Sequence, residues 1–509
     1  MRGSRRFVAV TAIAAAAIGT IAATAQAKGP EDDDDDEGTG SASGLVAPAD
    51  PAKRSTWLTE KLAAAINPRL RARLSYVVVD LTTGQELATR DADKGMNIAS
   101  NAKLLTSVAA LRTLGAGFRW RTSVHATGKI DKDGTVAGDL YLRGRGDPML
   151  TVQQLQHLAE EVAAAGIHAV DGRLVIDASY FDDKYEPPHF SEQPWEQAGF
   201  RAPVAALSVA RGAVTVTVVA EAAGKARVTV SPECDYVKIV KDQVTSSREG
   251  ASRLRIEAKT VRDRFEIEAT GVIRDGRGSW DLRKRVDDPA RLAGEVFRKA
   301  LAEHGIRIKR GVASGTVPMG AKPIAAHDSQ TLADVLRFMN KASDNTVAET
   351  VLKTIGAEAK KGAAPATWAD GVAALVAELG KVGVSGFRSD NGSGLFASSE
   401  VSARQLVKLL GVAHKDFRIG PDLMASLPVG GVDGTLARRW KGRPAYGRVR
   451  AKTGTLEKVS SLSGYVAVEA ARPIAFAIIA NDVAPGQMPL VKAAADDMVD
   501  ALVAYLSAR

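Results

Sequence analysis

Three short motifs in this 509-residue chain have the residue types and the spacing that a reaction would need. The first is the pair Ser100 and Lys103, three positions apart within residues 97–114, where apolar residues recur at helical spacing. A serine hydroxyl needs a neighbouring base to become a nucleophile, and a desolvated lysine near other cations can be neutral enough to serve. The pair therefore predicts a serine nucleophile with a lysine base. The alternative interpretation is an exposed helix start without chemistry.

The second motif, Ser343-Asp344-Asn345, lies between two segments of helical spacing, residues 332–340 and 346–355. A loop between helices can direct a hydroxyl and a carboxamide into a cleft. The same residue types also favour helix N-termini, because their side chains accept hydrogen bonds from free backbone N–H groups. The motif therefore predicts either a polar loop beside a site or a plain helix cap.

The third motif is Lys452-Thr453-Gly454-Thr455, shortly before an expected strand at residues 461–468. On a strand edge, lysine and threonine can hold a ligand carboxylate or an extended peptide, and glycine lets another backbone approach closely. A charged edge strand that resists aggregation is the alternative interpretation.

Together and in this order, the three motifs form the set known for β-lactamases and penicillin-binding proteins. Over residues 58–505 the chain resembles the class C low-molecular-mass penicillin-binding proteins, which are serine-type D-alanyl-D-alanine carboxypeptidases and endopeptidases. This subfamily carries a large insertion between the first two motifs, and here Ser343 follows Ser100 by 243 positions. Four further runs also resemble the subfamily: residues 143–148, 202–208, 339–341 and 427–436.

The resemblance implies a role for each catalytic residue in cleaving a peptidoglycan stem peptide. Ser100 would attack the carbonyl of the penultimate D-Ala, and Lys103 would take its proton. Ser343 would pass a proton toward the leaving amine with electrostatic support from Lys452, and Asn345 would hold the substrate's backbone amide. The resemblance implies no metal and no organic cofactor. Penicillins and other β-lactam inhibitors would acylate the same serine.

The resemblance assigns substrate binding to the third motif. Lys452, Thr453, Gly454 and Thr455 would bind the terminal carboxylate or the neighbouring acceptor chain. The backbone N–H groups of Ser100 and Thr455 would meet the oxyanion, which is usually the largest electrostatic contribution in acyl transfer.

Two other functions fit the same motifs. A β-lactamase shares all three, but the long separation of the first two and the subfamily-like runs within it favour the peptidase. A catalytically idle wall-binding or scaffold protein is disfavoured by the intact motifs. One departure from the subfamily pattern is visible, because Asn391 replaces its aspartate, with Asp390 beside it. No role is therefore carried over to that carboxylate.

The elements expected around the motifs give an α/β (α+β) fold. Residues 118–320 differ from the rest, because short β-branched runs alternate there with Gly, Asp and Pro turns, and one clear helix interrupts them at residues 152–165. We expect a β-lactamase/transpeptidase-like sandwich of an antiparallel sheet with helices, built from residues 53–117 and 321–509. A β-rich insertion of two lobes, 118–320, interrupts it and is expected to supply neither nucleophile, base nor oxyanion hole.

The core elements expected from hydrophobic spacing are strands and helices in blocks. A hairpin opens the core, helices follow, and two strands and a helix close it. The expected strands are residues 74–81, 86–89, 461–468 and 473–480, and the expected helices are 97–114, 332–340, 346–355, 367–379, 402–412 and 489–507.

The N-terminus has the order of an export signal, with arginines among the first six residues, an apolar run over 7–25 and then Ala25-Gln26-Ala27. We expect residues 1–27 to be a signal peptide and residues 28–52, acidic and then rich in Gly and Ser, to be a solvated tether. An uncleaved membrane anchor is the alternative, because the apolar run nearly spans a bilayer. The protein is expected in the periplasm or cell envelope, with membrane contact only peripheral or through that segment.

Composition excludes several other classes. A chain that is 45% hydrophobic and 25% charged is a folded protein. Its net charge of +9 alone would allow a nucleic-acid partner, but an exported chain without a basic–aromatic pattern is expected to bind no nucleic acid. Cys234 is the only cysteine and the seven histidines form no HExxH pattern, so neither an intramolecular disulfide nor a metal site is expected.

Overall fold

The computed structural model describes the chain from residue 45 onward with short gaps. The described ranges are residues 45–222, 224–276, 278–361, 363, 365–469 and 473–508. The expected signal peptide therefore lies outside the described residues, as does the expected tether as far as residue 44. Among the described residues, no helix is both long and apolar enough to cross a bilayer.

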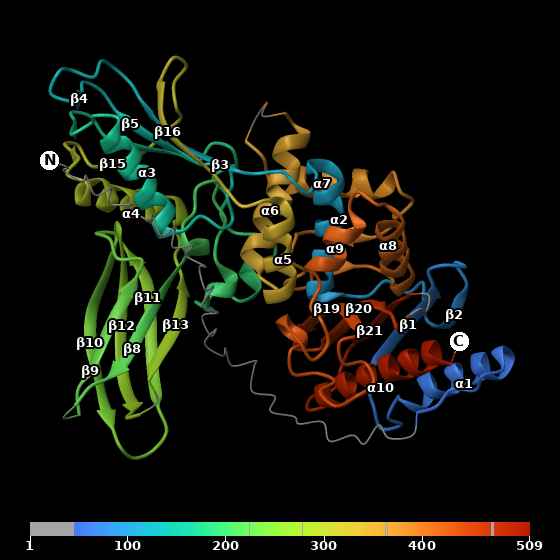
Figure 1. The fold of residues 1–509 in the computed structure, drawn as a ribbon. Helices are drawn as coiled ribbons and strands as arrows, with labels where there is room; N and C mark the ends of the chain where they lie inside the picture. The colour runs from blue at the N-terminus through green and yellow to red at the C-terminus, as the bar shows by residue number, and fades with distance from the viewer. Residues whose placement is uncertain are drawn as a thin grey trace, which may run out of the picture.

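A five-stranded antiparallel sheet forms the base of the core (Figure 1). Its strand order is β19-β20-β21-β1-β2, so the first strands of the chain lie beside the last. Strand β1 pairs with β21 along its whole length, from Arg73 opposite Asn481 to Asp80 opposite Ile474. The antiparallel sheet expected from the sequence is confirmed. Its strands are β1 (Arg73–Asp80), β2 (Glu86–Arg90), β19 (Val449–Leu456), β20 (Val459–Val466) and β21 (Ile474–Asn481).

Helices cover both faces of this sheet. Helices α1 (Pro51–Ala64) and α10 (Met488–Ser507) lie against one face, and α8 (Ala403–Lys415) lies against the other (Figure 1). Because successive strand residues point to opposite faces, Val78 packs with the α1 and α10 side and Val77 with the α8 side. Burial on both faces explains why these strands are continuous apolar runs in the sequence.

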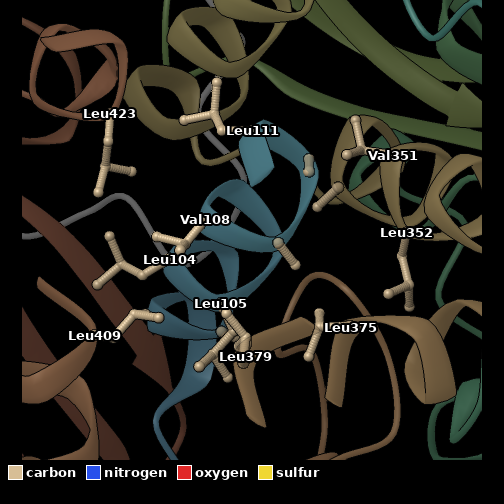
Figure 2. Close-up of a cluster of buried hydrophobic side chains, with 14 of the residues drawn as sticks. Leu104, Leu105, Val108, Leu111, Val351, Leu352, Leu375, Leu379, Leu409 and Leu423 are labelled. Carbon is tan, nitrogen blue, oxygen red and sulfur yellow. The ribbon is translucent and has the colours of Figure 1, made fainter. Parts of the chain in front are cut away.

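Helix α2 (Ala102–Leu114) runs through the middle of the helical layer. Every residue from 102 to 111 is buried. Leu104 and Val108 lie among leucines and valines of the neighbouring helices (Figure 2). Truncating one such leucine to alanine typically costs about 2–5 kcal/mol, so packing holds the helix firmly. The neighbouring helices are α5 (Leu332–Ala342), α6 (Asn345–Ala359), α7 (Trp368–Gly380) and α8.

The region that follows α2 contains a mixed five-stranded sheet of order β15-β7-β5-β3-β16 and a small sheet of order β14-β6-β4 (Figure 1). Helices α3 (Val152–Ala164) and α4 (Pro289–Glu303) pack on each other and on the larger sheet. The strands are β3 (Arg121–Ala126), β4 (Thr135–Val136), β5 (Leu140–Arg143), β6 (Ala169–Val170), β7 (Leu174–Asp177), β14 (Arg307–Ile308), β15 (Val312–Ser314) and β16 (Lys322–Asp328).

A second group of strands hangs from the first and forms two three-stranded sheets, β10-β12-β11 and β13-β8-β9 (Figure 1). One continuous cluster of buried apolar residues extends through both groups. The strands are β8 (Ala213–Ala220), β9 (Ala226–Ser231), β10 (Val237–Ser247), β11 (Arg253–Val261), β12 (Arg264–Arg274) and β13 (Ser279–Arg285).

Two features of this region differ from the sequence-based expectation. Strand β16 runs to Asp328, beyond residue 320, because it returns antiparallel beside β3 and closes that sheet. The region also holds two helices, where one was expected. The unexpected helix α4 begins with Pro289, and the side chain of Asp288 caps it. Proline at the first helical position starts a helix and does not mark a turn.

The remaining expected helices are confirmed to within a few residues as α2, α3, α5, α6, α7, α8 and α10. The segment 97–114 differs in one respect, because a 3₁₀ turn, Ala99–Asn101, precedes α2. Helix α1 was not expected. It begins at Pro51 behind the capping residue Asp50, inside the range assigned to the tether.

Candidate active site

Ser100 lies in the 3₁₀ turn at the start of α2, partly exposed above a buried helix. Ala99 before it has φ 45°, a left-handed conformation that costs energy in an L-residue. Gly394 lies against this turn so closely that an added Cβ would come within 1.8 Å of the Ala99 carbonyl oxygen. The hydroxyl of Ser461 on β20 donates to the Ile98 carbonyl oxygen (2.7 Å) and accepts from the Asn101 side chain (2.6 Å). These contacts hold the serine in one place.

Lys103 contacts three groups at once. Its Nζ lies 3.0 Å from Ser100 Oγ and donates to Asn345 Oδ1 (2.7 Å) and to the Ser393 carbonyl oxygen (2.8 Å). A neutral amine has two N–H bonds and one lone pair. Since the Asn345 and Ser393 oxygens can only accept, they take the two N–H bonds, and the lone pair is left facing the serine hydroxyl.

The electrostatics of Lys103 favour the neutral amine. Burial lowers the pKa of its ammonium to about 7, while the negative charges of Glu349 and Asp344 act in the opposite direction. An ordinary lysine remains protonated until pH values above 10. Near neutral pH, a substantial fraction of Lys103 can therefore accept a proton.

The second lysine of the motifs, Lys452, is also fully buried. Its Nζ donates to Ser343 Oγ (2.8 Å) and to the Thr453 carbonyl oxygen (2.9 Å). Burial, together with the neighbouring positive charge of Lys103, lowers the pKa of Lys452 well below its ordinary value. The two lysines thus lie on either side of two serine hydroxyls in one buried network.

The loop between α5 and α6 serves both purposes considered for the second motif. Asp344 is the helix cap, since its Oδ1 accepts from the backbone N–H of Val347 (3.0 Å). Ser343 ends α5 in a left-handed conformation with φ 55° and directs its hydroxyl to Lys452. Asn345 opens α6 and reaches Lys103.

The third motif lies on the outer edge of the sheet, because β19 is its terminal strand. The backbone N–H of Ala451 points outward to the Pro428 carbonyl oxygen (3.1 Å), so strand alternation places those of Thr453 and Thr455 on the same edge. An added Cβ on Gly454 would lie 2.9 Å from the Ser100 backbone nitrogen. Glycine is therefore what lets β19 approach the serine turn.

Sequence reasoning missed Glu349, a buried acid on α6. Its carboxylate accepts from the backbone N–H groups of Gly392 and Ser393 and from Trp368 Nε1, each at 2.9 Å. It thereby fixes the loop whose Ser393 carbonyl contacts Lys103. A single acid one turn after Asn345, among apolar residues, is the signal that could have revealed it.

The asparagine that departs from the subfamily pattern holds the same loop. Asn391 Oδ1 accepts from the Gly394 backbone N–H (2.9 Å), and its Nδ2 donates to the Leu395 carbonyl oxygen (3.1 Å). An ionised carboxylate could not make the second bond, because it carries no proton. Asp390 instead contacts His189, with 2.9 Å between Nε2 and Oδ2.

Residues of the region 118–320 also reach this site, which the sequence analysis did not anticipate. The Phe200 carbonyl oxygen accepts from Asn345 Nδ2 (3.2 Å), and Arg211 Nε lies 3.1 Å from Asp344 Oδ2. Neither residue belongs to a pattern that marks a site in the sequence. Within the described ranges, no three His, Cys, Asp or Glu side chains gather as metal ligands would.

Comparison with known proteins gives consistent relatives. A family model described as the D-Ala-D-Ala carboxypeptidase 3 (S13) family matches residues 58–504. The chain is 36% identical over 450 residues to a D-alanyl-D-alanine carboxypeptidase of Actinomadura sp. (strain R39), covering 84% of this chain and 81% of that protein. It is 26% identical over 441 residues to the D-alanyl-D-alanine carboxypeptidase DacB of Haemophilus influenzae, covering 85% and 88%.

The crystal structure of penicillin-binding protein 4 (dacB) from Haemophilus influenzae is similar with a TM-score of 0.71 at 24% identity. The match covers 86% of this chain and 97% of that one. The same protein has also been solved in complex with a β-lactam. This likeness confirms the penicillin-binding, transpeptidase-like fold expected from the three motifs.

Proposed function

Because the chain belongs to the D-Ala-D-Ala carboxypeptidase 3 (S13) family, we propose that it is a serine-type D-Ala-D-Ala carboxypeptidase and D,D-endopeptidase that works through an acyl-enzyme. Its relatives are D-alanyl-D-alanine carboxypeptidases, hydrolases of peptidoglycan stem peptides. The observation that carries the serine-type proposal is the contact of Lys103 Nζ with Ser100 Oγ at 3.0 Å, with both N–H bonds of the neutral amine directed elsewhere.

Acylation begins when Ser100 Oγ attacks the carbonyl carbon of the penultimate D-Ala and its proton passes to Lys103 Nζ. The carbonyl oxygen becomes an oxyanion and accepts from the backbone N–H groups of Ser100 and Thr455. The C–N bond then breaks, and the leaving amine takes a proton through Ser343, whose hydroxyl is bonded to Lys452. Water attacks the resulting ester, and the freed serine regains its proton.

The two proposed activities share the acyl half of this reaction. In the carboxypeptidase reaction the leaving group is the terminal D-Ala. In the endopeptidase reaction it is the amine of a neighbouring stem peptide in a cross-link. Lys452, Thr453, Gly454 and Thr455 bind the carboxylate or the neighbouring chain on the leaving side, because β19 offers an unpaired edge there.

Asn345 retains capacity to hold the substrate's backbone amide. Its Oδ1 already accepts from Lys103 and its Nδ2 already donates to the Phe200 carbonyl oxygen. A carboxamide has two N–H bonds and two lone pairs, so one of each is left for a substrate.

Penicillins are proposed to acylate Ser100 as substrate-like inhibitors, with hydrolysis of the ester slow. The catalytic part is proposed to comprise residues 53–117 and 321–509 with residues 118–320 as an inserted region. Residues 1–27 are proposed as an export signal that delivers the protein to the periplasm or cell envelope, where its substrate lies.

The proposal is tested with purified protein and cross-linked muropeptides, analysed by mass spectrometry. We expect release of D-Ala and cleavage of cross-links, both lost in Ser100→Ala together with labelling by a fluorescent penicillin. Labelling at another serine, found by peptide mapping, would contradict the assignment. Fast turnover of penicillin without release of D-Ala would identify a β-lactamase instead.

A further inference from the structure

We propose that the inserted region sets the working pH of the catalytic base through Arg211, which makes Arg211 a positioning residue that acts by way of Asp344. This inference rests on the proposed function, since it concerns the acylation of Ser100. It assigns to residues 118–320 a part in the chemistry, although none of the three motifs lies there.

The first observation is that the inserted region docks along the whole length of α6. At the C-terminal end, Trp120 Nε1 donates to Thr354 Oγ1 (2.9 Å). One residue earlier, the buried Lys353 Nζ donates to Asp182 Oδ1 (2.5 Å). At the N-terminal end, Asn345 Nδ2 donates to the Phe200 carbonyl oxygen. The helix that carries Asn345 and Glu349 is therefore held against the inserted region.

The second observation is an ion pair at the S-D-N loop. Arg211 Nε lies 3.1 Å from Asp344 Oδ2, with the side chains only 24% and 10% exposed. The nitrogen has no aligned hydrogen-bond acceptor, so the contact is an ionic one. The guanidinium also lies 5.0 Å from the ring centroid of Phe338 on α5. Arg211 thus contacts both the loop and the helix before it.

The turn that presents Arg211 is strained. Ala210 and Arg211 are consecutive L-residues with φ of 51° and 56°. Such conformations cost about 1–3 kcal/mol each and persist only where the surroundings impose them. Arg283 on β13 supports the turn, since its Nη2 donates to the Ala210 carbonyl oxygen (2.8 Å). Burial and the charge of Arg211 lower the pKa of Arg283 to about 10, which marks two cations crowded beside one carboxylate.

The charges around Lys103 give this arrangement its consequence. Asp344 and Glu349 both stabilise its ammonium form, whereas Lys452 on β19 opposes it. Arg211 and Arg283 are the cations that face Asp344 from the inserted region. By offsetting the carboxylate, Arg211 favours the neutral amine that takes the serine proton. Removing Arg211 leaves the carboxylate less compensated, so the pKa of Lys103 rises.

The test is the pH profile of acylation by a fluorescent penicillin, with Arg211→Gln compared to the wild type. We expect the acid limb of the second-order acylation rate to move up by about 0.5–1 pH unit, which is roughly a three- to tenfold loss at pH 7. Arg211→Lys keeps the charge and should move the limb less. Arg227→Gln is the matched control, since Arg227 is an exposed arginine of the same region paired with Glu221.

A double variant separates charge from structure. Adding Asp344→Asn to Arg211→Gln removes the carboxylate that Arg211 offsets, and asparagine caps a helix as well as aspartate does. The limb should then return to the wild-type position or below. An unchanged limb in Arg211→Gln, or no reversal in the double variant, would overturn the inference. A wild type that penicillin does not label would instead refute the proposed function. If Arg211→Gln does not fold, Arg211→Lys and the double variant still give the comparison.

Discussion

Charged side chains are treated in opposite ways in the catalytic core and in the outer sheets of the inserted region. In the core, Lys103 and Lys452 are 0% exposed and bonded to serine hydroxyls and carbonyl oxygens. In the outer sheets, a typical pair is Arg227 with Glu221, whose side chains are 62% and 44% exposed. A buried charge shifts its pKa and becomes available for chemistry, whereas an exposed pair is screened by water.

The strands of the two regions differ in the same sense. All eight residues of β20 and of β21 are buried, because helices cover both faces of the core sheet. In β11, exposed and inward-facing residues largely alternate, because only one face of its sheet packs on a core. The core is therefore built to exclude water from a site, and the outer sheets present a polar surface. Arg211 is informative because it belongs to the inserted region but is buried like a core residue.

The largest expected effect within the core comes from replacing its base. Lys103→Met should slow acylation by penicillin by about 100- to 10,000-fold, the range of a general base. In the wild type, acylation should rise with pH through about 7, since the amine becomes neutral as pH passes its pKa. Stopped-flow fluorescence measures both. A loss of less than roughly tenfold, below that range, would favour Ser343 or Lys452 as the base.

Lys452→Ala should separate recognition from proton transfer. A terminal carboxylate gains a charge-assisted contact that an amide cannot match, worth about 1.5–3 kcal/mol, or roughly ten- to a hundredfold. We therefore expect a larger loss of kcat/KM for a D-Ala-D-Ala peptide with a free carboxylate than for its amidated analogue. Equal losses for both peptides would place Lys452 on the proton path alone.

Glu349→Gln tests whether the buried acid positions the Ser393 loop. A glutamine can accept only one of the two backbone N–H bonds, and its NH₂ group faces the other donor, so unfolding should become easier by about 2 kcal/mol. Loss of the negative charge lowers the pKa of Lys103, so the acid limb of acylation should move to lower pH, opposite to Arg211→Gln.

Thermal unfolding and the pH profile measure these two effects of Glu349→Gln. The control is Glu221→Gln, a glutamate of the outer sheets with an exposed partner. If the acid limb stayed in place while stability fell, Glu349 would act on the loop alone and not on the base.

The smallest effect is expected in the outer sheets. Arg227→Gln breaks an exposed pair with Glu221, which is typically worth about 0–1 kcal/mol. Acylation and its pH profile should be unchanged, and the midpoint of thermal unfolding should move little. A clear loss of acylation in this variant would mean that the outer sheets influence the site by a route that the contrast between the two regions does not include.

The sequence alone determined the elements and the order of the motifs, because both depend on local spacing. The three-residue step from Ser100 to Lys103 places hydroxyl and amine on one turn. Long apolar runs and helical periodicity identified the core strands and most of the helices. The helices α1 and α4 escaped because Pro51 and Pro289 look like turn residues although they stand at helix starts.

Only the tertiary structure decided which groups surround the base. Asn345 and Ser393 reach Lys103 from 242 and 290 positions away, and Arg211 reaches Asp344 from a different region of the fold. Such contacts follow from packing, which leaves no local pattern in the sequence. A lysine in the printed chain has an ordinary pKa, and it becomes a base near pH 7 only when the folded chain removes its water and fixes the charges around it.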